Sequence, residues 1–454
     1  MEIAIILSII FMIFLMVFIK KIDDLFLLLM SSVFLINWIA DELYLIPHFF
    51  TWCIEFIIGI LFLNYLLPKI VFLKKINLKP FGKYIILLFL YSLIGSLTHF
   101  VNFSDIALGF RALFKYLFLF IIFINSNFSQ KSYKKFFTFW LILMGIQPFV
   151  GSYQYLIEGS VSDPVSGTLL STGFASILLI VFIICLIDLI NQKKVNNFII
   201  YIFIFLSATI IPIFGEAKAF FYFLPLAFFI RYINLILSFK IFNILKLIFS
   251  LIVGIYLIQT IFFNVWKVEL FNFGGIDSSD FLFSQGSESV TTSENPQATL
   301  AISISERYLA IMAVYNFLNE DKSRIFFGDG LGSNIFTYES RQDLTRKQIG
   351  GISTQEDYLK KFTLGKIIQN IGVIGFLLFC LLLLMISIYS YRASLVIEDN
   401  FFKKVYQILP AFSLLFFISI FYSDPFEDSI AFSYWFFVSS LNYLPQLRKI
   451  NYLK

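Results

Sequence analysis

Arg111 and Lys115 are the side chains of this chain best suited to hold an anion inside a membrane. They stand four residues apart in an otherwise apolar run, so a helix would place both on one face. Arginine offers a planar fork to phosphate oxygens and lysine a compact charge. Charge within such a run is costly and usually functional. The pair therefore predicts a phosphate or diphosphate site, and the alternative is a structural ion pair with Glu55.

Three further cations are candidates for the same chemistry. Lys218 lies in the short connector "FGEAKAFF", and Arg307 and Arg341 lie in a long polar segment further along the chain. Glu339, two residues before Arg341, could act as a general base toward a hydroxyl group. The competing interpretations are a local ion pair between Glu216 and Lys218 and simple solvation of the loop cations.

The composition excludes a soluble globular protein. Hydrophobic residues make up 59% of the chain and charged residues 14%, well below the ~25% that is usual for soluble domains. The net charge of +5 is modest, so we expect a membrane topology signal and no nucleic-acid partner. The three cysteines fall in apolar runs, and the two histidines have no companions at metal-ligand spacing. We therefore expect no disulfide, no metal and no cofactor.

Apolar runs long enough to cross a bilayer recur along the chain and predict an all-α polytopic membrane protein. We expect about thirteen transmembrane helices, with residues 1–264 holding about ten, residues 265–364 forming one large extracytoplasmic loop, and residues 365–454 holding about three. The expected spans are 3–19, 25–40, 48–67, 84–100, 106–124, 136–157, 169–190, 197–214, 219–237, 241–264, 366–390, 405–423 and 429–445.

The connectors between these spans alternate in charge. Connectors 41–47, 101–105, 158–168 and 424–428 hold almost no cations, whereas the others are rich in lysine and arginine. Because basic loops stay in the cytoplasm, we expect the N-terminus outside, the C-terminus inside and the 265–364 loop outside. The acidic 424–428 connector is then expected to be a solvated turn.

The long loop contains two patterned stretches. Ser303 and Glu306 have capping-box spacing, and Ile304, Tyr308, Ile311, Met312 and Tyr315 recur at helical intervals, which predicts an amphipathic helix over about 300–319. Gly328, Gly330 and Gly332 alternate in the following segment. Their spacing predicts either a plain turn or a cradle of exposed amides for an anion.

Three patterns together resemble the bacterial O-antigen polymerase (Wzy) and O-antigen ligase (WaaL) superfamily. "GEAKAFF" is similar to the family's small-residue turn that opens a span, with Lys218 in the basic position. "SERYLAIMAVYNFLNEDKSRIFFGDGLGSNIF" is similar to its arginine-led helix and glycine turn, with Arg307 in the arginine position. "IIQNIGVIGFLLFCLLLL" is similar to the close of its loop, where Gly372 and Gly375 open the next span.

The resemblance implies a metal-independent glycosyltransferase of the bacterial inner membrane. Its donor would be an oligosaccharide on undecaprenyl pyrophosphate, and membrane lipid and a chain-length regulator would be its other partners. Arg307, Arg341, Lys218 and Glu339 would be catalytic. The substrate would be bound by a second set of residues: Arg111, Lys115, Tyr308, Gly330 and Gly332.

Polymerase is favoured over ligase by one departure from the family pattern. Ligases carry a His-Asn pair about eleven residues before the glycine at 372, a place that Lys361 and Phe362 occupy in this chain. The ligase, which hands the glycan to lipid A core or protein, is the nearest alternative. A flippase or transporter and a cell-wall synthase of the shape-and-division type are weaker alternatives, because internal repeats are not apparent and the span count is high.

Overall fold

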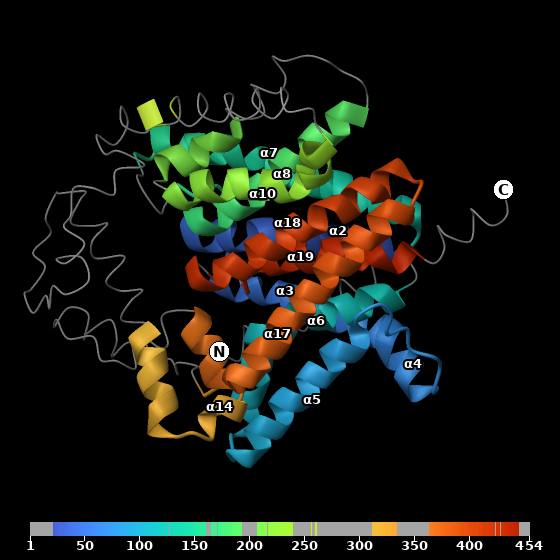
Figure 1. Cartoon of the computed structure of the whole chain (residues 1–454), viewed down its shortest axis with the longest axis vertical. Coiled ribbons are helices and arrows are strands. Elements are labelled where there is room, and N and C mark those ends of the chain that lie inside the picture. Colours follow the sequence, from blue (N-terminus) through green and yellow to red (C-terminus); the bar gives the residue numbers. More distant parts are fainter. Residues whose placement is uncertain are drawn as a thin grey trace, which may run out of the picture.

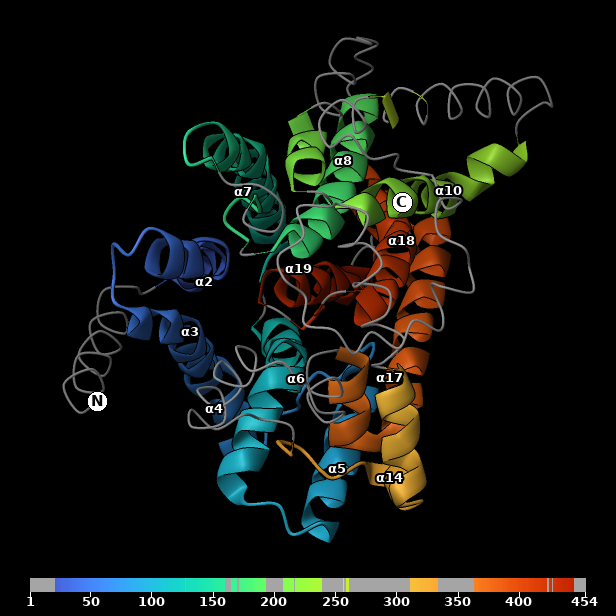
Figure 2. The same cartoon turned by 90° about the vertical axis from the view of Figure 1, so that its left-hand side faces the viewer.

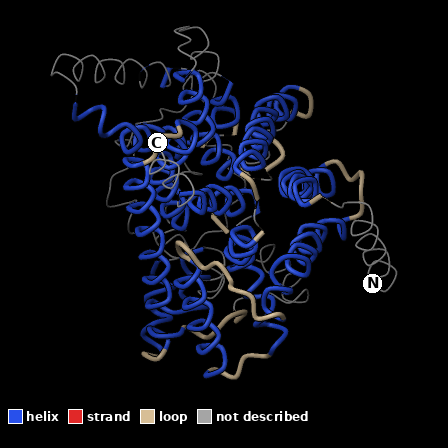
Figure 3. The backbone as a smooth tube through the Cα atoms, turned by 90° about the vertical axis from the view of Figure 1, so that its right-hand side faces the viewer, coloured by secondary structure: helices blue, strands red, loops and turns tan. Residues whose placement is uncertain are grey.

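The computed structural model of the chain is a bundle of helices joined by loops, and its described residues contain no strand (Figure 3). The structure describes residues 21–126, 128–159, 165–169, 171–192, 207–215, 217–238, 256, 259–260, 311–333, 363–422, 424–426 and 428–444. The predictions for Arg307, Tyr308, Glu339 and Arg341, for the span 3–19, and for most of the spans 197–214 and 241–264 lie outside these residues.

In chain order, the helices and helical turns of the described residues are α2 (Ile22–Asn37), a π-turn η1 (Trp38–Glu42), a 3-10 turn η2 (His48–Trp52), α3 (Cys53–Leu61), a π-turn η3 (Phe62–Leu66), α4 (Leu67–Val71), α5 (Gly82–Thr98), α6 (Phe103–Asn125), α7 (Gln130–Leu156), α8 (Thr172–Gln192), α10 (Lys218–Ser238), α14 (Arg324–Phe327), α17 (Thr363–Val396), α18 (Asn400–Tyr422), α19 (Asp428–Ser439) and a 3-10 turn η4 (Ser440–Tyr443). Residues 207–214 and 311–320 are also helical.

The chain is a helical membrane protein by the length and composition of its helices. Seven helices of the described residues are long and apolar enough to span a bilayer, and Gly82–Thr98 and Ala219–Ile233 are shorter apolar helices. The all-helical prediction is confirmed for the described residues. The count of thirteen spans and the external position of the 265–364 loop remain predictions.

Helix α19 forms the centre of the bundle. Every residue from Ser429 to Ser439 is buried, and α19 packs on α6, α18 and α2 (Figures 1 and 2). Its rings fill the interior: Phe436 stacks on Tyr133 of α7 at 4.8 Å between centroids, and Trp140 donates to Ser433 Oγ at 2.9 Å. A helix that is apolar on all sides belongs in a core. Helix α19 is enclosed by protein, so it does not have to be as long as the hydrocarbon layer is thick.

Several helices begin earlier than their apolar runs. Lys131, Lys134 and Lys135, which we expected in a connector, lie in the first turns of α7, where Ser129 Oγ accepts a hydrogen bond from the Ser132 amide at 3.0 Å. Lys403 and Lys404 likewise lie inside α18. Long basic side chains can extend from a helix end to a polar boundary, so hydropathy places the start of the helix too late.

The structure gathers helix starts into two groups, and which group faces outward remains a prediction from connector charge. The starts of α3, α6 and α19 meet at one end through Glu55, Arg111, Lys115 and Asp428. The starts of α2, α7 and α18 meet at the opposite end through Lys135–Asp24 and Lys134–Asp399 contacts. We call the first group the predicted outer end and the second the predicted inner end.

An ion pair that the sequence analysis missed joins α8, α10 and α18 toward the predicted inner end. Arg231 donates from Nε and Nη2 to Asp188 Oδ2 at 2.9 and 2.7 Å, and both side chains are at most 7% exposed. Tyr232 donates to Asp188 Oδ1, and Lys404 donates to the Asp188 carbonyl oxygen. The available signal was one acidic and one basic residue, each inside an apolar run.

Replacing Asp188 with alanine should destabilise the bundle by about 3–5 kcal/mol, because Arg231 is left buried without its counter-ion. The double variant Asp188→Leu, Arg231→Leu should recover most of that loss. Thermal unfolding of the purified protein in detergent measures both. A single variant that unfolds like wild type would show that the pair contributes nothing.

Candidate functional site at the predicted outer end

Arg111 is held by two contacts that leave much of its guanidinium accessible. Its Nε donates to Glu55 Oε1 at 2.8 Å, and its Cζ lies 4.6 Å from the centroid of the Trp52 ring. The side chain is nevertheless 42% exposed. Within the described residues, Nη1 and Nη2 donate to no partner. Glu55 holds the guanidinium through Nε and Trp52 covers one of its faces, so the N–H groups of its two terminal nitrogens are suited to bind a phosphate group.

Lys115 has a different environment from Arg111, one turn away. Its Nζ bridges Glu55 Oε1 at 3.1 Å and Asp428 Oδ1 at 2.5 Å, and its side chain is only 12% exposed. The pairing with Glu55 that we held open as the alternative is therefore present. Lys115 joins α3, α6 and α19 and is positioned to orient Glu55, whereas Arg111 is the accessible cation of the pair.

The acidic connector between α18 and α19 is tied down at both ends, and the prediction of a solvated turn is wrong for two of its carboxylates. Asp428 bonds Lys115, and Asp424 Oδ2 bonds Lys366 Nζ of α17 at 2.9 Å. All four charged residues were visible in the sequence. Their pairing was not, because Lys115 and Asp428 are 313 residues apart and Lys366 and Asp424 are 58 residues apart. With Glu55, Arg111, Lys115 and Lys366 included, three carboxylates balance three cations in this region.

The glycine segment makes a buried turn between α5, α6 and α17. The Leu331 amide donates to Ser96 Oγ at 2.8 Å, the Gly332 amide to Asn370 Oδ1 at 2.6 Å, and the Asp329 amide to the Gln369 carbonyl at 2.7 Å. The plain-turn interpretation is confirmed. The prediction of an exposed amide cradle is wrong for these three positions, because folding uses their N–H groups for packing.

Helix α17 is broken where the glycine segment reaches it. Gly372 has φ +69° and ψ 178°, and a Cβ there would lie 2.3 Å from the Phe326 carbonyl oxygen. The residues before the break, from Thr363 to Ile371, are almost all buried. The break lets a short helical segment pack against the loop before α17 continues as an apolar helix. Gly372 therefore lies inside α17, which begins at Thr363, and does not open the helix as expected.

The described part of the loop helix, residues 311–320, packs on α17 with a face other than the expected one. Ala313, Val314 and Phe317 are buried against Ile368. Ile311, Met312 and Tyr315, expected on the apolar face, are 37–60% exposed. Arg324 holds this helix to the glycine turn through Glu320, Asp329 and the Phe317 carbonyl. Contact with α17 determines which face of this helix is buried, and the periodicity of the helix alone does not predict that contact.

A second polar cluster lies at the predicted outer ends of α2 and α7. Gln154 donates to Glu42 Oε2 at 2.9 Å and accepts from the amides of 166 and 167, and Gln147 Oε1 accepts from the Thr168 amide at 2.7 Å. A Cβ at Gly215 would lie 2.9 Å from the Val165 carbonyl oxygen. The turn that leads to Lys218 therefore contacts the inserted 165–168 turn. Lys218 itself is the first residue of α10.

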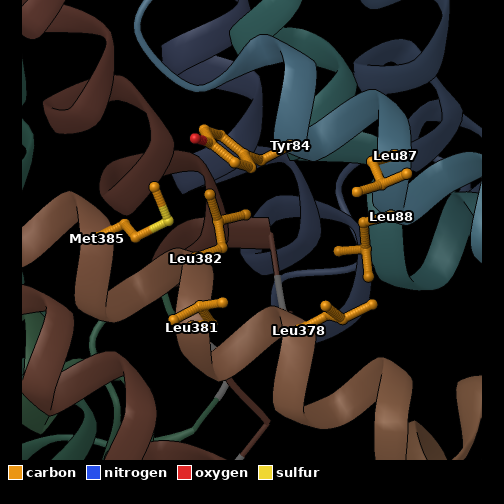
Figure 4. A pocket seen from close by; sticks show the side chains of 7 residues that line it. All are labelled: Tyr84, Leu87, Leu88, Leu378, Leu381, Leu382 and Met385. Carbon is orange, nitrogen blue, oxygen red and sulfur yellow. The ribbon is translucent and has the colours of Figure 1, made fainter.

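A small apolar pocket lies elsewhere, between α5 and α17 (Figure 4). Its lining residues are Tyr84, Leu87, Leu88, Leu378, Leu381, Leu382 and Met385. None of the predicted site residues lines it.

A scan against protein-family models found no match to the chain, and a search of curated proteins found none either.

Proposed function

We propose that the protein is a polysaccharide polymerase of the O-antigen or capsule type, acting on undecaprenyl-pyrophosphate-linked glycan at the outer face of the bacterial inner membrane. The observation that carries the proposal is the Arg111 guanidinium, which is fixed by Glu55 and Trp52 and whose Nη1 and Nη2 have no partner among the described residues. The three sequence patterns around Lys218, Arg307 and Gly372 support it.

The reaction needs little beyond positioning and charge. The bond between the donor sugar C1 and the diphosphate oxygen breaks, and a bond forms between that C1 and a hydroxyl oxygen of another lipid-linked repeat unit. The hydroxyl proton leaves to a base, and undecaprenyl pyrophosphate departs with the bonding electrons. Because the leaving group is already charged, the protein chiefly stabilises the diphosphate and orients the hydroxyl.

Arg111 would contact the diphosphate, and Glu55 and Lys115 would position Arg111. Arg307, Arg341 and Lys218 are proposed to add further positive charge, with Glu339 as the group that activates the hydroxyl. The described cluster of charges is balanced, which favours a division of roles. Glu55 and Lys115 orient the Arg111 guanidinium, and the remaining cations supply the net positive charge that the diphosphate requires.

Deleting the gene tests the proposal against its alternatives. Loss of a polymerase leaves one repeat unit on the lipid core, loss of a ligase leaves none, and loss of a flippase leaves lipid-linked units on the inner side. We expect the single-repeat pattern in an electrophoretic analysis of surface polysaccharide. Long chains of wild-type length in the deletion strain would contradict polymerase function.

Replacing Arg307 with alanine should abolish polymer and leave single-repeat glycan, because a diphosphate in a low-dielectric site depends strongly on each cation. Polysaccharide from cells that carry the variant as their only copy gives the measurement. Lys322, an exposed cation of the same loop, is the matched control, and Lys322→Ala should keep wild-type chain lengths. Normal chains with Arg307→Ala would remove Arg307 from the mechanism.

A further inference from the structure

Trp52 is an exposed aromatic residue that stacks on Arg111, the cation that would bind the diphosphate. The residue is 44% exposed at the end of η2, immediately before α3. Its ring centroid lies 4.6 Å from the Arg111 Cζ, and Arg111 is in turn hydrogen-bonded to Glu55 three residues after Trp52. The ring and the guanidinium therefore form one continuous surface. Trp52 and Glu55, both at the start of α3, hold the guanidinium in place.

The chemistry of the substrate places a sugar beside this surface. In a lipid-linked glycan, the first sugar is joined to the diphosphate through a single oxygen. If Arg111 holds the diphosphate, that sugar ring must lie next to the guanidinium. The ring face of a pyranose carries C–H groups, which pack well on the flat, electron-rich face of an indole. Within the described part of the site, Trp52 is the aromatic ring in contact with Arg111.

We propose that Trp52 binds the sugar directly attached to the diphosphate and so determines which donor sugar is accepted. This inference rests on the proposed function. It assigns recognition of the sugar to η2 and α3, in the N-terminal part of the chain, as well as to the long loop. It also gives Arg111 and Trp52 separate tasks, since one recognises the diphosphate and the other the carbohydrate.

A simpler role for an exposed tryptophan is an anchor at the membrane interface, where aromatic residues are common. Tyr44 serves as the matched control for that role, because it belongs to the same connector between α2 and α3 and is 82% exposed. An anchor role would be shared by the two residues. Sugar binding would be a property of Trp52, which is stacked on Arg111.

The test compares the binding of two probes to purified protein in lipid nanodiscs. One probe is undecaprenyl pyrophosphate, and the other is the lipid-linked repeat unit extracted from cells that lack this chain. We expect wild type to prefer the repeat unit by roughly tenfold, the size expected of one aromatic contact. Trp52→Leu should lose that preference, so that its affinities for the two probes agree within about twofold. Trp52→Phe should keep part of the preference, and Tyr44→Leu all of it.

Each other outcome overturns a defined claim. If Trp52→Leu weakens both probes equally, Trp52 acts only through Arg111, and the inference fails. If Trp52→Leu keeps the preference, the sugar is recognised elsewhere, and the inference also fails. If wild type binds neither probe, the proposed function fails with it. Thermal unfolding of Trp52→Leu at the wild-type temperature shows that the variant is folded.

Discussion

Cells that carry Arg111→Ala as their only copy of the gene are expected to lose glycan longer than one repeat. Removing one preorganised donor from a developing anion typically costs about 10²–10³ in rate, and Arg111 supplies two such donors. Arg111→Lys should recover only part of the activity, because a lysine can still pair with Glu55 but lacks the planar fork. In vitro turnover of lipid-linked repeat units by purified protein gives the magnitude.

Two controls separate this role from a structural one. Arg392→Ala removes an exposed cation near the other end of α17 and should leave chain length unchanged. The Arg111 variants should unfold at close to the wild-type temperature, because Glu55 retains Lys115 as a partner. Full activity in Arg111→Ala would exclude the residue from diphosphate binding and leave the ion pair with Glu55 as its whole function.

Gly332→Ala is expected to detach the loop from the bundle. A Cβ at this position would lie 1.9 Å from the Asp105 carbonyl oxygen, and the backbone has φ +88°, which favours glycine. We expect a loss of stability on the order of 3 kcal/mol or more and new protease cleavage within 311–333. Limited proteolysis followed by mass spectrometry locates the cuts.

The residue of α6 that faces Gly332 gives an independent variant. Gly109 of α6 has an ordinary helical backbone, but its Cβ would lie 2.3 Å from the Gly332 amide nitrogen. Gly109→Ala should therefore expose the same loop segment without any backbone strain. Gly59→Ala is the control, because that Cβ would meet nothing within 4 Å, and it should change stability by less than about 1 kcal/mol. An intact loop in both Gly332→Ala and Gly109→Ala would show that the turn is not wedged between the helices.

The sequence alone determined that the described chain would be helical and where most helices would lie. Long apolar runs allow only a helix in lipid, because each backbone N–H and C=O must be satisfied within its own segment. In the described residues, helix starts gather in two groups at opposite ends, and which group faces outward remains a prediction from connector charge. Lys115 and Lys134, at opposite ends, illustrate this, since each pairs with a carboxylate at its own end of the bundle.

The site was only partly predictable. Arg111 and Lys115 looked equivalent in sequence because they share one helix face. The structure distinguishes them, with Lys115 enclosed between Glu55 and Asp428 and Arg111 open to its surroundings. Lys366 and Trp52 were overlooked because their significance depends on Asp424 and Arg111, which come from other helices. Local spacing carries no information about such partners.

What the sequence settled by itself was the class of structure and the ends at which charge collects, since hydropathy and connector charge act locally on each segment. Only the tertiary structure decided which cation stays accessible, which face of the loop helix is buried, and that the amides of the glycine turn are used in packing. These outcomes depend on carbonyls and side chains brought together from α3, α5, α6, α17 and α19. Burial and hydrogen bonding among distant segments are properties of the packed bundle, so no single stretch of the chain specifies them.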